Sequence, residues 1–543
     1  MEQEVSVRRL NLAHPLSAGR LRIAVPVLAT VALLCAPPAW LAAGGVASAG
    51  STPPPATPTP PFARPAIFDR VEEFRLENGM LFLLLPRPGL PMVSGRIRFR
   101  VGNMDSPTGQ SGLPHMFEHM AFKGTDRIGT RDITAEMQVQ DSVSAVGSAL
   151  AREVRRRAAG DSVLIKQLRE ELQRLTDRQI ALTVPMEFPR VYDEYTFNYN
   201  AWTSRDFTEY LADLPSGELE VWMLMESERI QRLSFREFYR ERDVVIEERR
   251  QSQDQPAYVA GELGQALAYT AHPYRLPVIG YMSELETLTQ EAAEQFHNTY
   301  YTPGNAVGVL VGDFDPQVAR KMIRDYFGDI PAGPAPSDVG TVEPEQTGLR
   351  RGVLRRGTER ELTLCFHSFE RSDRRSMVAE LLADVLSRDI TSRLDRRLDT
   401  KEKAARSVWA DAGVDGRDAG LFAVHATPLE GFTNERVEEM IWEELARVVS
   451  EPVTREKLDE IKASRRKRFY RGLATNAALA EGLSTGQALD GDWRRWLERR
   501  REIESVTVEE VTDLARTLFT KDHATIIYLE PGEAAQDQTG GGR

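Results

Sequence analysis

The sequence predicts an α+β fold, on three features of the chain. Residues 93–101 alternate apolar and polar side chains with a period of two, which is typical of a half-buried strand. The next segment predicts a helix, because Pro114 suits a first helical turn and Gly124 suits the position just past a helix end. The apolar run at residues 306–312 then predicts a second strand, and Asp315-Pro316 opens another helix. Strands and amphipathic helices therefore mix along the chain.

An internal repeat predicts two lobes of similar construction. Each copy runs through a helix, a short turn and an apolar strand, and residue types recur at a constant offset. The matched pairs, each 218 positions apart, are Thr289 with Thr507, Glu291 with Glu509, Phe296 with Leu514, Tyr300 with Leu518, and Ala306 with Ala524. The stretch at 332–348, which carries Pro and Gly, marks the boundary, so we expect a first lobe at 66–335 and a second, metal-free lobe at 349–531.

The two ends of the chain are expected to lie outside these lobes. Residues 1–49 carry arginines before an apolar run and end on Ala47-Ser48-Ala49, which is the pattern of a cleaved signal peptide. This pattern predicts an exported, periplasmic protein. A membrane anchor that is not cleaved is the alternative, because the apolar run approaches spanning length. Residues 50–65 are expected to form a Pro-rich spacer and residues 532–543 a disordered tail.

The net charge and the cysteine content limit which partners the protein can bind and how its fold can be stabilised. The formal net charge of −12 argues against a nucleic-acid partner and favours cationic peptides as substrates. The chain contains two cysteines, Cys35 and Cys365, and the first would leave with the signal. We therefore expect no intramolecular disulfide, so that stability must come from buried cores.

Residues 115–119 carry the clearest chemical signal, the pattern H-x-x-E-H, which is a zinc-peptidase signature in inverse order. His115 and His119 lie four positions apart, so both imidazoles can face one ion from one side of a helix. Three protein ligands leave one position on zinc for water, and a nearby carboxylate can take the proton of that water. We assign this role to Glu118. The alternative is two helical histidines beside an unrelated glutamate.

Spacing alone does not choose the third ligand. Several glutamates lie on predicted helices, and most helical glutamates are merely solvated. Glu241 and Glu248 are two helical turns apart and share a face. The candidates are Glu226, Glu228, Glu237, Glu241, Glu247 and Glu248.

Residues 112–125 closely resemble the active-site helix of the pitrilysin/insulinase family of zinc metallopeptidases, which includes the mitochondrial processing peptidase. Residues 240–248 look like the second zinc helix of that family. The resemblance implies that Glu248 is the third ligand of one zinc ion per chain. It also assigns Glu241 to the catalytic site as a supporting carboxylate.

Further matches extend the resemblance over residues 70–330. Residues 200–204 resemble the family's strand beside the substrate cleft, which implies that Asn200 and Ala201 align the substrate. Residues 272–274 and 300–306 match the end of the family's first lobe. The implied fold is two homologous α/β-roll lobes that face a chamber. The implied activity is that of an endopeptidase, which hydrolyses peptides or unfolded polypeptides with Glu118 as the general base.

Two departures from the family pattern stand out. A charged helical insertion at residues 138–190 lengthens the chain between the ligands, with leucines at 164, 168, 172 and 175. We expect it to pack on its own lobe; an arm that docks a partner or gates the substrate is the alternative. Asp399 and Arg406 stand where the family often has an Arg and a Tyr that contact the substrate carbonyl.

The absence of this pair predicts a heterodimer, in which a related subunit carries the Arg and the Tyr.

Two other classes of protein stay open. The chain could be a catalytically silent binding or assembly subunit, although His115, Glu118, His119 and Glu248 are intact. A purely structural zinc site is the third class, but one mature cysteine cannot supply the usual closed set of four Cys or His ligands.

Overall fold

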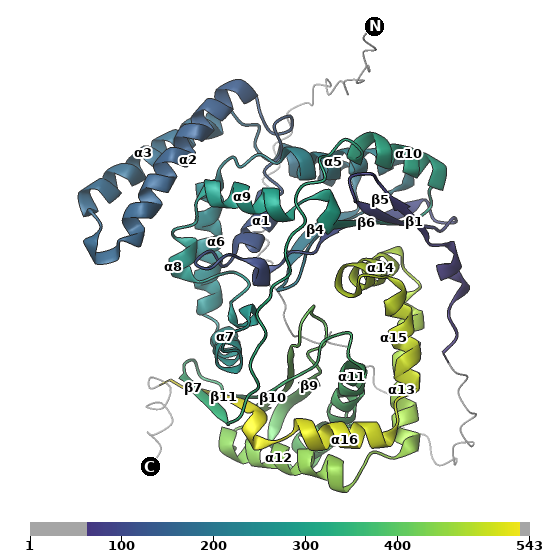
Figure 1. Ribbon diagram of the computed structural model, residues 1–543. Helices are drawn as coiled ribbons and strands as arrows, with labels where there is room; N and C mark the ends of the chain where they lie inside the picture. Colours follow the sequence, from purple (N-terminus) through teal and green to yellow (C-terminus); the bar gives the residue numbers. More distant parts are fainter. Residues whose placement is uncertain (1–61, 533–543) are drawn as a thin grey trace, which may run out of the picture. The chain divides into compact units, whose positions relative to one another are not determined.

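Two mixed β-sheets, each packed with helices, organise residues 62–532, which are the residues that this computed structural model describes (Figure 1). The first sheet has six strands in the order β1-β2-β6-β3-β5-β4, and the second has five in the order β7-β11-β8-β10-β9. The predicted α+β class, with two lobes that each contain a mixed sheet packed with helices, is confirmed. The predicted signal peptide and nearly all of the spacer and tail lie outside the described residues.

The strands of the first sheet are β1 (Glu72–Arg75), β2 (Leu81–Pro86), β3 (Met92–Phe99), β4 (Asn198–Thr203), β5 (Thr208–Pro215) and β6 (Ala306–Gly312). The helices of this part are α1 (Leu113–Met120), α2 (Ile133–Arg155), α3 (Ser162–Ala181), α4 (Glu187–Tyr195), α5 (Leu219–Arg232), α6 (Phe238–Gln253), α7 (Pro256–Ala268), α8 (Met282–Leu285), α9 (Gln290–Tyr300) and α10 (Pro316–Phe327). Short 3₁₀ turns include η1 (Ala66–Arg70), η2 (Asn103–Asp105) and η5 (Pro273–Arg275).

The second sheet contains β7 (Arg350–Arg355), β8 (Glu361–His367), β9 (Ala405–Asp411), β10 (Leu421–Pro428) and β11 (Ala524–Glu530). Its helices are α11 (Arg374–Leu386), α12 (Asn434–Ser450), α13 (Arg455–Gly472), α14 (Asn476–Asp490), α15 (Arg494–Glu504), α16 (Val508–Leu518) and the π-helix η7 (Asp395–Lys401). Within the described residues, no helix combines the length and the hydropathy that crossing a membrane requires.

The predicted repeat corresponds to the same unit in both lobes. Helix α9 and strand β6 recur as α16 and β11, with both bounds of each element shifted by 218 positions. Thr289 and Thr507 cap the two helices, because each side chain accepts a hydrogen bond from a backbone N–H of the first turn. Each strand then pairs in parallel with one neighbour and antiparallel with the other. The matched residues therefore mark a shared topology.

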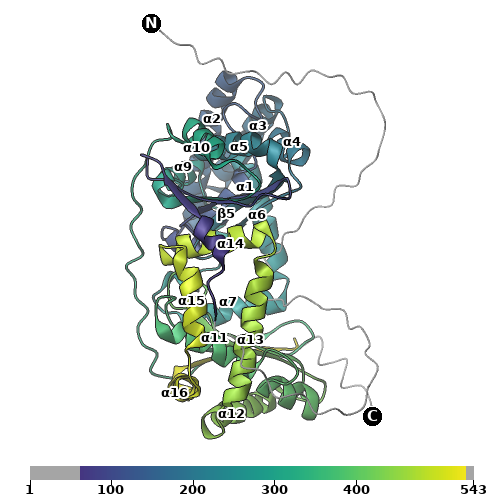
Figure 2. The same ribbon diagram turned by 90° about the vertical axis from the view of Figure 1, so that its right-hand side faces the viewer.

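Strand β3 is buried on both faces, so the prediction of a half-buried strand was wrong. On one face, Gly95 lies so close to the indole of Trp222 on α5 that a Cβ there would be 2.5 Å from the ring. On the other face, Arg96 and Arg98 have only 8% and 0% of their surface exposed. Helix α14 covers these polar positions, because Glu481 on this helix pairs with both arginines. Figure 2 shows α14 next to the sheet that contains β5. The polar residues of the alternating pattern therefore face a buried layer of charged side chains and not solvent.

Helix α14 also joins the two lobes through an apolar core. Leu83, Leu85 and Val309 of the first sheet belong to the same buried cluster as Leu479 and Leu483 of α14. A segment from the second half of the sequence thus completes the core of the first half. The lobe boundary near residues 335–349 stays a prediction: the two largest buried clusters lie on opposite sides of it, and this third cluster spans it.

Helices α2 and α3 pack side by side in the region of the predicted insertion (Figure 1). The pair packs on its lobe through α2, where Gly147 lies against the Tyr239 ring of α6. Leu172 and Leu175 are buried, whereas Leu164 near the start of α3 is 37% exposed. The packing therefore agrees with an arm that folds onto its own lobe, and a docking role stays a prediction.

Candidate active site

Helix α1 carries the H-x-x-E-H residues and turns them away from the core. Gly112 precedes the helix with φ +89°, a conformation that favours glycine, and Pro114 occupies the first turn. The apolar side chains of this helix, Leu113, Met116, Phe117 and Met120, are buried. The polar side chains His115, Glu118 and His119 are left half-buried on the opposite side.

The helix ends earlier than the sequence predicted. Its last residue is Met120, so Gly124 is not the residue just past the end. Gly124 instead has φ +95° in the following turn, where a Cβ would lie 2.3 Å from the carbonyl oxygen of Ile128. The glycine is required by the turn and not by the helix terminus.

Helix α6 packs against α1 and brings the third predicted ligand to the histidines. The Nε2 atoms of His115 and His119 lie 3.7 and 3.4 Å from the two carboxylate oxygens of Glu248. One candidate ligand atom from each of the three residues lies within 4.8 Å of the others. The structure thus brings together all three residues to which the resemblance pointed.

This arrangement fits a zinc ion. Two imidazoles and one carboxylate are the donor set of many catalytic zinc sites. Tetrahedral zinc with bonds of about 2.0–2.1 Å separates its ligand atoms by about 3.3 Å, which is close to the 3.7 and 3.4 Å between the imidazole nitrogens and the Glu248 oxygens. Among the described residues, this is the group of His, Cys, Asp and Glu side chains that meets the geometry of a metal site.

Glu241 lies behind the ligand His119. Its carboxylate is 3.8 Å from the Nδ1 atom of His119 and forms an ion pair with Lys123. Burial raises the pKa of Glu241, but the bond to His119 and the charge of Lys123 lower it below its usual value overall. Glu241 therefore remains a carboxylate that can orient the ring. Sequence reasoning missed Lys123, and only its place just after the metal helix could have indicated it.

The pKa values of the two histidines shift in opposite directions. Burial lowers the pKa of His115. Burial also disfavours the charged form of His119, but Glu241 and Glu248 raise its pKa to about 9. The two carboxylates thus stabilise a positive charge at this place in the metal-free protein. A bound divalent cation would supply that charge and displace the proton.

The predicted substrate-aligning residues lie on β4, which is an edge strand that pairs only with β5 within the described sheet. Ala201 is buried and Asn200 is exposed, and the Asn200 side chain accepts a hydrogen bond from the backbone N–H of Ala201 at 2.9 Å. Helix α1 packs next to this strand, and the Thr203 hydroxyl donates to the carbonyl of Pro114. The edge strand and the metal helix are therefore direct neighbours.

The residues that replace the family's Arg and Tyr lie on the second lobe. Asp399 is exposed in η7. Arg406 is exposed on β9, where its guanidinium group pairs with both oxygens of Glu359. Neither residue contacts the three candidate ligands.

Comparisons with known proteins show which proteins this chain resembles. Zinc protease PqqE of Helicobacter pylori is 23% identical over 471 residues, which cover 85% of this chain and 93% of that protein. The uncharacterized zinc protease YmxG of Bacillus subtilis is 22% identical over 470 residues, which cover 85% and 99%. The relatives are thus named zinc proteases.

The solved structures that match share the fold. A protease from Helicobacter pylori aligns with a TM-score of 0.71 at 21% identity, covering 85% of this chain and 99% of that chain. The periplasmic protease PqqL from Escherichia coli aligns with a TM-score of 0.60 at 19% identity, covering 87% of this chain and 48% of that chain.

The family model described as "Peptidase M16 inactive domain" matches residues 287–465. Residues 287–465 are thus similar to a domain of the M16 peptidases, and the two zinc proteases named above are similar over 85% of the chain. The residues of the candidate metal site, His115, His119 and Glu248, lie outside the matched stretch.

Proposed function

We propose that the chain is an exported, zinc-dependent endopeptidase that hydrolyses peptides or unfolded polypeptides. The observation that carries the proposal is the approach of Glu248 to His115 and His119, with Glu118 on the same helix. The N-terminal pattern of residues 1–49 supports export.

The residues of the site take distinct roles in this proposal. His115, His119 and Glu248 would hold the ion, and a bound zinc ion would polarise the scissile carbonyl and lower the pKa of water. Glu118 takes a proton from the attacking water and passes it to the leaving amine. Glu241, paired with Lys123, keeps the ring of His119 in place.

The edge strand β4 supplies the substrate site. An extended peptide can add to a free sheet edge through main-chain hydrogen bonds, which demand little of its side chains. Asn200 and Ala201 lie on this strand and would align the peptide beside α1. This mode of binding suits peptides and unfolded chains better than folded proteins.

The test is a cleavage assay on an unfolded polypeptide, with the Glu118→Gln variant and a chelator. We expect Glu118→Gln to bind zinc as the unmodified protein does and to lose about 10²–10⁴-fold in kcat, which is the usual contribution of a general base. Glu247→Gln is the matched control, because Glu247 is exposed on α6 and pairs with Arg250. Undiminished cleavage by Glu118→Gln, or in excess chelator, would contradict the proposal.

A catalytically silent subunit is the second candidate. The match to a domain described as inactive favours it, as do Asp399 and Arg406 in place of an Arg and a Tyr that would stabilise the developing oxyanion. An active heterodimer with a related subunit that carries the pair reconciles both observations. Full peptidase activity of the isolated monomer would rule out the need for a partner.

A further inference from the structure

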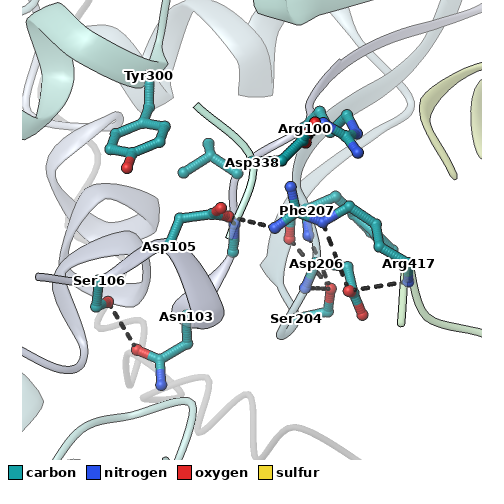
Figure 3. A network of polar contacts seen from close by, with 12 residues as sticks. Arg100, Asn103, Asp105, Ser106, Ser204, Asp206, Phe207, Tyr300, Asp338 and Arg417 are labelled. Atoms are coloured by element: carbon teal, nitrogen blue, oxygen red, sulfur yellow. Dashed lines mark hydrogen bonds and ion pairs between the residues drawn. The ribbon is translucent and has the colours of Figure 1, made fainter. Parts of the chain in front are cut away.

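Arg417 of the second lobe is buried between two aspartates of the first (Figure 3). Its Nη2 atom lies 2.5 Å from Asp105, and its Nε atom lies 3.6 Å from Asp206. The three side chains have 6%, 2% and 9% of their surface exposed. Arg417 belongs to the loop between β9 and β10, which contains none of the candidate metal ligands.

Asp105 connects this contact to the metal helix. It lies in η2, between β3 and α1, and its carboxylate also accepts the backbone N–H of Gly102 at 2.8 Å. Asn103 in the same turn accepts the backbone N–H of Gly112, the residue that precedes α1, at 2.8 Å. The placement of η2 therefore sets where the helix of His115 begins.

Asp206 connects the same contact to the edge strand. It lies in the turn that leaves β4, where the Ser204 hydroxyl accepts its backbone N–H. The carbonyls of Ser204 and Arg205 accept the backbone N–H groups of Asn103 and Met104 at 3.1 and 3.0 Å. The turn after the strand and the turn before the helix are thus bonded to each other, and Arg417 holds both.

Tyr274 and Gly416 complete the junction. The hydroxyl of Tyr274 donates to Asp206 at 2.5 Å and accepts the backbone N–H of Asp418 at 3.1 Å. A Cβ at Gly416 would lie 2.4 Å from that hydroxyl, so the loop leaves no room for a side chain here. Tyr274, one of the residues 272–274 that the sequence singled out and that the proposed reaction does not use, thus has a structural contact in this junction.

We propose that Arg417 is a positioning residue, which fixes the edge strand β4 relative to the metal helix α1. The expected effect on cleavage rests on the proposed function. The placement of β4 relative to α1 does not depend on it. Without the guanidinium, two buried carboxylates would face each other with no cation between them, which favours separation of the two turns. Small errors in the placement of substrate-binding groups are costly for a reaction.

The structural arm of the test is amide hydrogen exchange on the metal-free chain. We compare Arg417→Met, Arg417→Lys and Gly416→Ala with the unmodified protein. The matched control is Arg465→Met, because Arg465 also bridges two carboxylates, Glu380 and Asp384, but within the second lobe. We expect faster exchange at residues 102–113 and 198–207 in Arg417→Met and Gly416→Ala, and unchanged exchange there in the control.

The kinetic arm uses the zinc-loaded chain and a peptide substrate. We expect kcat/KM to fall by about tenfold to a hundredfold in Arg417→Met with zinc content unchanged, and an intermediate loss in Arg417→Lys, since one ammonium cannot reproduce a guanidinium fork. Exchange at residues 102–113 and 198–207 equal to that of the unmodified chain would overturn the inference. If the unmodified chain cleaves nothing, the isolated chain is not an endopeptidase by itself, and the exchange arm still decides the positioning role.

Discussion

At the scale of single residues, His119 gives the site a property that can be measured without substrate. Its pKa of about 9 in the metal-free fold lies above the ordinary 6.5. The stabilisation from protonated His119 is therefore complete below pH 6.5 and is lost as the pH rises through 9. The loss amounts to about 3 kcal/mol at most.

We expect the free energy of unfolding of the chelated protein to fall between pH 6.5 and 9, as measured by urea denaturation. His119→Gln removes the titrating group, so this variant should lose that part of the pH dependence. Zinc binds the neutral imidazole, so the loaded protein should not show this step. An identical pH profile for the chelated protein and His119→Gln would show that the carboxylates do not raise the pKa of His119.

The sequence identified the site residues on α1 more readily than the residues that contact them from other elements. His115, Glu118 and His119 lie within one turn of helix, so local spacing is enough to group them. Glu248 lies 129 positions after His119, and spacing left it among several glutamates until the family resemblance selected it. Lys123 lies just after the metal helix, but its partner Glu241 is far along the chain, and Arg417 acts through contacts across the fold that no local pattern reveals.

At the scale of elements, the contact between β3 and α14 is a buried layer of charge. Arg98 pairs with Glu209 and Glu481 at 2.9 and 2.8 Å, and Glu209 also accepts the indole N–H of Trp202 on the edge strand. Burial raises the pKa of Glu209, but Arg98 and Arg96 lower it to about 2. The carboxylate is therefore charged at neutral pH and depends on its arginines.

We expect Arg98→Met to lower the free energy of unfolding by about 3–5 kcal/mol, because it leaves a buried carboxylate short of a partner. The control is Arg100→Met, two positions along the chain, where the ion pair with Asp338 is exposed. That change should cost less than about 1 kcal/mol. Equal denaturant midpoints for the two variants would show that the buried layer contributes no more than a surface pair.

The same contact explains why the burial of β3 could not be read from the sequence. Alternating polar residues predict a solvent-facing side when nothing covers it. The cover here comes from α14, which lies more than 370 positions later in the chain. By contrast, α9 with β6 and α16 with β11 could be predicted, because each unit is contiguous and capped by its own threonine.

At the scale of the whole molecule, the two lobes share a core and are expected to unfold together. Leu83 and Val309 of the first sheet pack in one cluster with Leu479 and Leu483 of α14. We expect calorimetry of the full chain to give one cooperative transition, and a fragment of residues 62–349 to lack one, because it would expose this cluster. Two separate transitions would mean that the lobes are independent domains.

The metal site can be tested by anomalous diffraction at the zinc absorption edge. We predict one peak per chain, bonded at about 2.0–2.2 Å to the Nε2 atoms of His115 and His119 and to the carboxylate of Glu248. Zinc bound elsewhere, or a peak between the histidines with the Glu248 carboxylate turned away, would show that these three residues do not form the zinc site.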